Sequence, residues 1–191
     1  MLNGRAPKRA APTCMVGIMA RRVPAAGLAA LALFCVCAGA SAIETPVLGA
    51  DSGLPVPRFV SLKTEGANGR RGPGVEHKVE WIYERPGLPL QVTGESGPWR
   101  RVRDPDEGQV WMHAQNLENR RTIYARPEAG SNYLALRSAP RDTSRAVAYL
   151  APGVIGALTA CEGAWRRVTV GGRVGWAHQD SLWGGEDCSG I

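Results

Sequence analysis

Apolar and polar residues alternate in short runs along most of the chain beyond residue 57. The clearest runs are 59–62, 79–83 and 88–92, and they are rich in β-branched and aromatic residues. Alternation with a period of two predicts half-buried β-strands. Turn-forming stretches such as Gly72-Pro73-Gly74 and Pro86-Gly87 separate the runs. Since no run carries a persuasive helical stripe, the pattern predicts an all-β protein built from short strands.

A long internal repeat organises these strands. The segment Trp99-Arg100-Arg101-Val102 recurs unchanged 66 residues later as Trp165-Arg166-Arg167-Val168. At the same offset Tyr83 matches Tyr149, whereas upstream the offset is 67 and downstream, where Trp111 matches Trp176, it is 65. Insertions of one residue are tolerated in turns. The sequence therefore predicts two copies of one small domain, each near the lower size at which a domain folds alone.

These observations predict the following organisation. A leader segment without the strand pattern occupies 1–42, followed by an N-terminal extension 43–57, a first domain 58–124, a linker 125–132, a second domain 133–186 and a C-terminal tail 187–191. Short strands joined by tight turns favour a closed or nearly closed barrel, which removes exposed sheet edges.

The order and spacing of the motifs in both copies resemble the bacterial SH3-like domain family. The resemblance rests on residues 136–140, 152–153, 163–168 and 175–182, and on their counterparts in the first copy. It implies two tandem five-stranded SH3-like barrels, each with one helical turn before the last strand, at 113–116 and 178–181. The first copy departs from the family at Gly69, where an apolar residue is usual, so we expect its first strand to be bent or weakly paired.

The first 42 residues differ from the rest and resemble a secretion signal. They contain five basic and no acidic residues, followed by an apolar stretch at 28–38 and the small-residue motif Ala40-Ser41-Ala42. Cleavage between Ala42 and Ile43 is expected, with translation starting at Met1 or Met19. An uncleaved membrane anchor is the alternative, but the stretch is shorter than the roughly 20 apolar residues of a transmembrane helix. We therefore expect a periplasmic or extracellular protein without a stable membrane span.

Removal of this segment changes the interpretation of charge and cysteines. The remaining 18 basic and 17 acidic residues leave a net charge of +1, which gives no electrostatic case for nucleic acid binding. Two of the five cysteines remain, Cys161 and Cys188. In an oxidising compartment such a pair predicts a disulfide, with two free thiols as the alternative.

The sequence does not predict catalysis or a cofactor. A disulfide would consume both remaining cysteines, and His113 and His178 occupy equivalent repeat positions, which favours a structural role over two active sites. No pair of histidines or cysteines has the spacing of a metal site. We expect a non-catalytic protein without a metal.

Aromatic residues are the candidates for ligand binding. All six tryptophans follow residue 80, and most are expected in the cores, because one indole removes 150 to 250 Å² from water. Grooves on small β domains are commonly aromatic as well. The candidate groove residues are Tyr83, Trp99, Trp111, Tyr149, Trp165 and Trp176. By resemblance, the protein is expected to bind cell-wall (peptidoglycan) peptides or an envelope protein, and the alternative is a structural or protein-protein interaction subunit with no wall ligand.

Overall fold

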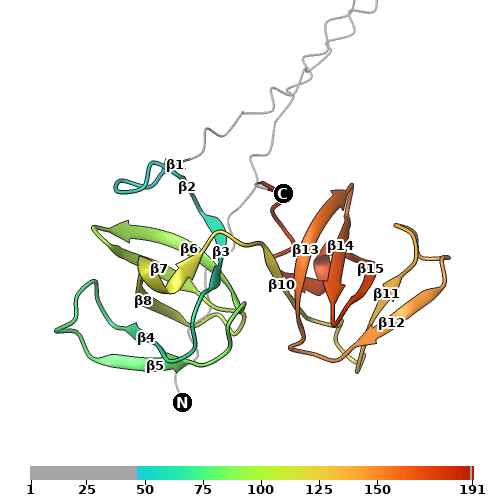
Figure 1. Ribbon diagram of the computed structural model, residues 1–191, viewed down its shortest axis with the longest axis horizontal. Helices are drawn as coiled ribbons and strands as arrows, with labels where there is room; N and C mark the ends of the chain where they lie inside the picture. Colours follow the sequence, from blue (N-terminus) through green and yellow to red (C-terminus); the bar gives the residue numbers. More distant parts are fainter. Residues whose placement is uncertain (1–46, 190) are drawn as a thin grey trace, which may run out of the picture. The chain divides into compact units, whose positions relative to one another are not determined.

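The computed structural model of this protein describes residues 47–189 and 191, and it is all-β (Figure 1). The predicted signal peptide, with its cleavage site at Ala42 and Ile43, lies outside the described residues. Within those residues, no helix is long and apolar enough to cross a membrane. The two helical segments that occur there are single 3-10 turns.

The first copy forms a seven-stranded antiparallel sheet that curls into a small barrel. Its order is β5-β4-β8-β7-β6-β3-β9, which returns the short last strand to the first long strand. The core consists mainly of aliphatic side chains such as Leu62, Leu90 and Val102, which are fully buried. Its elements are β3 (Arg58–Leu62), β4 (Ala67–Arg70), β5 (Val79–Tyr83), β6 (Pro89–Ser96), β7 (Trp99–Arg103), β8 (Gln109–His113), η1 (Ala114–Asn116) and β9 (Leu117–Glu118).

The second copy repeats this arrangement strand for strand. Its order is β12-β11-β15-β14-β13-β10-β16, and its core is again aliphatic, with Leu136, Leu158 and Val168 among the buried residues. Its elements are β10 (Thr122–Ala125), β11 (Leu134–Arg137), β12 (Ala146–Leu150), β13 (Ile155–Glu162), β14 (Trp165–Val170), β15 (Arg173–His178), η2 (Gln179–Ser181) and β16 (Leu182–Trp183). Tandem β domains with matching order confirm the predicted fold class.

Each sheet has seven strands where five were expected. The long first loop of each copy forms a hairpin of its own, β4–β5 or β11–β12, and this hairpin adds two strands to the five of the barrel. The helical turns expected before the last strands are present as η1 and η2, with His113 and His178 at their N-terminal caps.

The repeated Trp-Arg-Arg-Val segment has the same structural role in both copies. Its valines, Val102 and Val168, are fully buried. Its first arginines fix the preceding turn: Arg100 donates to the carbonyl of Gly97 at 2.7 Å, and Arg166 donates to the carbonyl of Gly163 at 2.7 Å. Both glycines have a left-handed φ that favours glycine. The motif therefore recurs because each copy needs the glycine turn, the arginine that hydrogen-bonds it and the valine of the core.

The two hairpins are related by an offset of 67, not 66. Arg70 pairs with Trp111 and Arg137 with Trp176, and within the hairpins Ala67 pairs with Tyr83 and Leu134 with Leu150. The counterpart of Tyr83 is therefore Leu150, and the match of Tyr83 with Tyr149 was wrong. A slip of one residue turns a side chain to the opposite face of a strand. Accordingly Tyr83 is 9% exposed and Tyr149 is 68% exposed.

Gly69 is followed directly by a register irregularity, as the expected bend of its strand implies. It pairs with Trp81, and the register irregularity that follows it recurs after Leu136 in the second copy. A Cβ atom at Gly69 would lie only 2.8 Å from both Tyr83 and Val110. In the second copy the large and small residues are exchanged: the buried Leu136 takes the place of Gly69, and it faces Gly175. A Cβ atom at Gly175 would lie 2.8 Å from the Cβ atom of Leu136.

The boundary between the copies also needs correction. Residues 122–124 were assigned to the first domain, but Thr122–Ala125 forms β10 and pairs with β13 and β16 of the second sheet. Trp183 from β16 is 4% exposed and donates its indole N–H to the carbonyl of Pro89 at 3.2 Å. Its ring also meets the edge of Phe59, with 5.5 Å between the ring centroids. These contacts join the last strand of the second sheet to the first copy.

The N-terminal extension ends in a small hairpin, β1 (Val47–Leu48) with β2 (Pro55–Val56), which is attached to the first barrel through Glu95. The Glu95 carboxylate accepts hydrogen bonds from the hydroxyl and amide of Ser52 and forms a 2.8 Å ion pair with Arg58. Burial raises the pKa of this carboxyl, but the hydrogen bonds from Ser52 and the contact with Arg58 outweigh burial and lower the pKa to about 2.

The C-terminal tail is fixed to the second barrel. Cys161 and Cys188 form the predicted disulfide, with their Cα atoms 6.3 Å apart. Arg121, which is 8% exposed, donates to the Asp187 carboxylate at 3.3 Å and to the carbonyl of Ser189 at 2.5 Å. The tail is thus held by one covalent link and by a buried guanidinium.

Candidate functional site

The first tryptophan of the repeated segment stands beside the same histidine in both copies. Trp99 and His113 meet edge to face with their ring centroids 5.3 Å apart, and Trp165 and His178 do so at 5.8 Å. The tryptophans begin β7 and β14, while the histidines end β8 and β15, and each pair is directly opposite in the strand register. All four side chains are half-buried, so one face of each pair is open to solvent.

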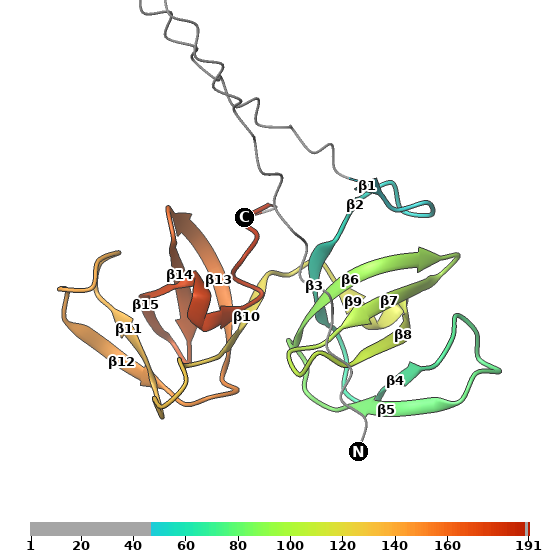
Figure 2. The same ribbon diagram turned by 180° about the vertical axis from the view of Figure 1, so that it is seen from behind.

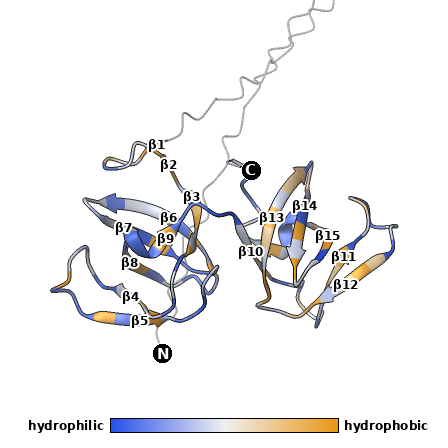
Figure 3. Cartoon of the chain, viewed as in Figure 1, coloured by the Kyte–Doolittle hydropathy of each residue, from blue (hydrophilic) through white to orange (hydrophobic). Residues whose placement is uncertain are grey.

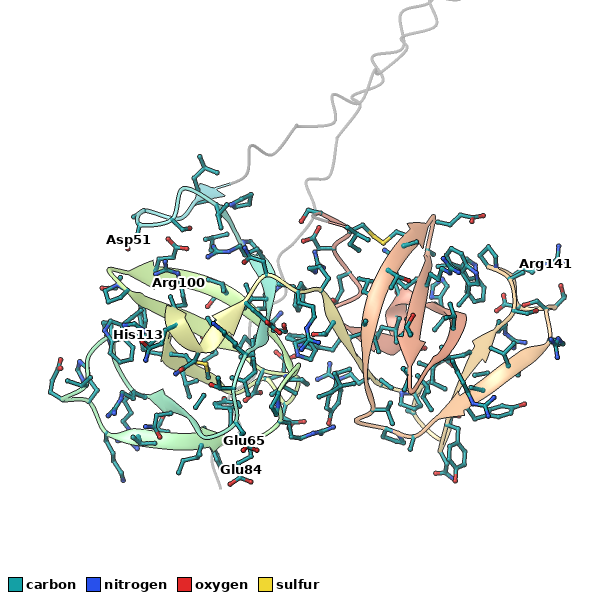
Figure 4. All side chains as sticks on the ribbon, viewed as in Figure 1. Asp51, Glu65, Glu84, Arg100, His113 and Arg141 are labelled. Carbon is teal, nitrogen blue, oxygen red and sulfur yellow. A yellow bond between two sulfur atoms is a disulfide. The ribbon has the colours of Figure 1, made fainter. Side chains whose placement is uncertain are left out.

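Each pair forms part of a groove closed on its far side by the first hairpin. An arginine at the equivalent position of each hairpin folds the loop. Arg70 donates to the carbonyls of Val75 at 2.9 Å and His77 at 2.7 Å, and Arg137 donates to the carbonyl of Ser144 at 2.8 Å. Figure 4 shows His113 and Arg100 on the first barrel. The arginines therefore hold the loop that completes the groove.

The two grooves differ in size and charge. The first groove has a volume of about 150 Å³ and is lined by Asn68, Arg70, Val75, Trp99, His113, Gln115 and Asn116. The second groove has a volume of about 190 Å³ and is lined by Pro127, Glu128, Ser131, Tyr133, Leu134, Ala135, Arg137, Asp142, Trp165, His178 and Ser181. The second includes two carboxylates and the first none, so the copies present the same aromatic pair in different electrostatic surroundings.

The structure separates the six predicted groove residues into three groups. Trp99 and Trp165 line the two grooves. Trp111 and Trp176 are half-buried and pair across the sheet with Arg101 and Arg167, but they do not line the grooves.

Tyr83 and Tyr149, the third group, are at other surfaces. The Tyr83 hydroxyl donates to Asp104 at 2.8 Å, and burial, this hydrogen bond and the negative charge of Asp104 together raise its pKa above the usual range. Tyr149 is exposed on β12.

The expectation that most tryptophans would be in the cores was wrong. Only Trp183 is buried. Trp81 is 63% exposed, although the period of two places it on the same face of the strand as Val79 and Tyr83. The reason is that β5 is the terminal strand of its sheet, so part of it extends past the core. Sequence analysis also missed four groove residues, His113, His178, Arg70 and Arg137. The two histidines could have been found, because they occupy equivalent positions in the repeat.

The histidines contact the turns that follow them. The His113 ring accepts a hydrogen bond from the amide of Gln115 at 3.3 Å, and His178 lies 3.3 Å from the Asp180 carboxylate. In the part of the chain that the structure describes, no group of three or more histidine, cysteine, aspartate or glutamate side chains is placed to hold a metal ion.

Comparison with known proteins identifies the family. The profile described as "Bacterial SH3 domain" matches residues 63–119 and again residues 130–184. The chain belongs to the bacterial SH3 domain family, with two tandem copies. Both matched segments contain the tryptophan, histidine and arginine of one groove. No curated protein matches the sequence.

Two solved structures show limited similarity to this chain. They are described as "Structure of NlpC2 from Trichomonas vaginalis" and "Structure of NlpC1 from Trichomonas vaginalis", with 13% and 16% sequence identity. The matches cover 66% and 71% of this chain, 48% of each of those chains, and have TM-scores of 0.30 and 0.29. The matched part is thus about half the length of those proteins.

Proposed function

We propose that this protein is an exported, non-catalytic binding module of the cell envelope that holds cell-wall peptides in its two grooves. The observation that carries the proposal is the duplicated groove, in which the Trp99 and His113 pair recurs as Trp165 and His178. A flat aromatic face with nearby backbone groups suits an extended peptide. Membership of the bacterial SH3 family supports a binding role over a catalytic one.

The grooves are suited to peptide backbone more than to large apolar side chains. Their volumes of about 150 and 190 Å³ are below the usual range of 300 to 1,000 Å³ for ligand pockets. Small, open hollows of this kind fit short side chains on an extended chain, and two of them on one protein increase the apparent affinity when both are occupied. We therefore expect weak binding at each groove and stronger binding to a polymer that displays many peptides.

Co-sedimentation with purified peptidoglycan tests this function. The wild-type protein should pellet with the polymer, and the double variant Trp99→Ala/Trp165→Ala should lose binding by about tenfold or more, as expected for aromatic anchors. Tyr149→Ala is the matched control, because Tyr149 is exposed outside both grooves. A folded double variant that pellets like the wild type would contradict the assignment of the grooves.

Two further outcomes separate the alternatives. If no binding to the wall is seen at any salt concentration, and envelope proteins are still captured after the wall is removed, the protein is an interaction subunit without a wall ligand. Export is tested by N-terminal sequencing of the protein from the producing cells, which should begin at Ile43. A chain that retains Met1 or Met19 would contradict export with cleavage.

A further inference from the structure

An open hollow beside the first barrel belongs to neither groove. It has a volume of about 470 Å³, within the range of ligand pockets, and is formed by β5, the turn after it and the β7–β8 hairpin loop. Trp81 and Tyr83 give aromatic faces, and Glu84, Asp104 and Asp106 give carboxylates. We call this hollow the acidic pocket.

The carboxylates of the acidic pocket are not equally engaged. Asp104 accepts hydrogen bonds from the Tyr83 hydroxyl at 2.8 Å and from the amides of Asp106 and Gly108 at 3.0 and 2.8 Å. By contrast, the side chains of Glu84 and Asp106 make no ion pair or hydrogen bond with any residue of the described chain. Figure 4 shows Glu84 pointing outward at the lower end of the first barrel. Two carboxylates are therefore available to a ligand.

The one basic residue of the lining does not neutralise them. The Arg85 guanidinium donates to the carbonyl of Gly153 at 2.6 Å and lies over the Tyr124 ring, 5.8 Å from its centroid. It is thus engaged with Tyr124, which also lines the pocket, and with one backbone carbonyl rather than with a carboxylate. With three acidic residues and one basic residue in the lining, the pocket carries a net negative charge and attracts cations.

A free sheet edge runs beside the pocket. β5 is the terminal strand of its sheet and pairs only with β4 among the described strands. Figures 1 and 2 show β5 at the margin of the first barrel from both sides, and Figure 3 shows strongly hydrophobic positions along it. Its Trp81 and Ile82 are 63% and 60% exposed. An unpaired edge with exposed apolar side chains is a template for adding another strand.

The second copy also has a free edge at β12, with an exposed Tyr149, but its hollow there has no carboxylate. By strand register, Trp81 corresponds to Ala148 and Tyr83 to Leu150. The hairpin loop Asp104 to Gly108 is replaced by the short turn Gly171-Gly172, so the carboxylates have no counterparts. The hollow there is lined by residues such as Val154, Val170 and Arg173. Since both copies share the fold, the barrel does not require the acidic pocket.

We propose that the edge of β5 and the acidic pocket together bind an extended segment of a partner protein that carries a lysine or arginine side chain. The segment pairs its backbone with β5. The hydrocarbon stem of its basic side chain lies on Trp81, and its charged end faces Glu84 and Asp106. This site goes beyond the proposed wall-binding function, because it shares no residue with either groove.

NMR titration of the ¹⁵N-labelled protein tests the proposal. The probe is the blocked peptide acetyl-Thr-Val-Lys-Val-Thr-amide, and its partner has norleucine in place of lysine. The lysine peptide should cause saturable shifts of the β5 amides and the Trp81 indole at millimolar concentrations, and added salt should weaken them. The norleucine peptide should bind several-fold more weakly.

Variants of exposed residues isolate the two parts of the site. Trp81→Ala should weaken binding by about two- to fivefold, the effect of a lost cation–π face at an exposed position. Asp106→Asn should weaken it by about threefold, as for an exposed ion pair. Tyr149→Ala and Glu162→Gln are matched controls at exposed positions of the second copy outside both grooves and should have no effect. Dispersed amide signals verify that each variant is folded.

Three results would overturn the proposal. They are equal binding of the lysine and norleucine peptides, shifts confined to the two grooves, and binding unchanged in a folded Trp81→Ala variant. A soluble wall fragment that shifts β5 more strongly than the lysine peptide would also overturn it, since the partner would then be the wall. Loss of peptidoglycan binding through the grooves would leave these results unchanged, so the two proposals fail separately.

Discussion

The first copy has glycine at position 69, where the second has the buried Leu136, and this difference tests how the cores of the two barrels are packed. In the first copy a Cβ atom at Gly69 would lie 2.8 Å from both Tyr83 and Val110, whereas carbon atoms in contact are about 3.5 to 4.0 Å apart. The neighbours would have to move by about 1 Å. Gly69→Leu should therefore destabilise the protein by about 3 kcal/mol, the upper part of the range for overpacking.

The second copy indicates which changes should relieve this strain. It has Leu136, Leu150 and Gly175 where the first has glycine, Tyr83 and Val110. The triple variant Gly69→Leu/Tyr83→Leu/Val110→Gly reproduces that set. It should be more stable than the sum of the three single effects by at least about 1 kcal/mol, because residues in contact couple.

Urea unfolding of the single, pairwise and triple variants measures this coupling. A loss of about 3 kcal/mol would also lower Tm by roughly 6 to 12 °C. The reasoning is refuted if Gly69→Leu costs less than about 0.5 kcal/mol, or if the three effects add within about 0.5 kcal/mol. Either result would mean that the barrel expands freely at this position.

Three other predictions concern single features. Because the pKa of Glu95 is about 2 in the folded protein and 4.5 ordinarily, its contribution is complete above pH 4.5 and is lost as the pH falls towards 2. After solvent screening we expect about 1 to 2 kcal/mol, absent in Glu95→Gln, in acid titrations of stability. Reduction of the Cys161 and Cys188 disulfide should cost about 3 to 4 kcal/mol, measured by urea unfolding with and without reductant. Trp183→Ala should cost about 3 to 5 kcal/mol, measured by thermal unfolding.

The duplicated scaffold could be predicted from the sequence because its signals are local. Turn glycines, alternating apolar residues and the repeated Trp-Arg-Arg-Val segment each have a direct structural reason, and the structure has them in the same strands of both copies. The disulfide was predictable for a similar reason, since only Cys161 and Cys188 lie beyond the predicted signal peptide.

The position of the single-residue insertion between the copies was not predictable. The matching tyrosines Tyr83 and Tyr149 placed it upstream of both, whereas the hydrogen-bond register places it after Tyr83, in the turn. A sequence alignment rewards identical residues, but strand pairing decides which face a side chain occupies. The exposure of Trp81 was also not predictable, because the alternation of apolar and polar residues does not show which strand is at the edge of a sheet.

The contrast between the β7–β8 loop and its counterpart has a consequence for how this protein could be modified. The residues that form the core and hold the turn before β7 are in the strands and in that turn. The carboxylates of the acidic pocket, by contrast, are on the β7–β8 hairpin loop and in the turn after β5. Glycines 171 and 172 show that the same two strands can be joined without that loop. The loop carboxylates thus lie outside the barrel core, although Tyr83 belongs to both the core and the pocket. Grafting residues 104–108 between β14 and β15 should therefore transfer negative charge without a new scaffold.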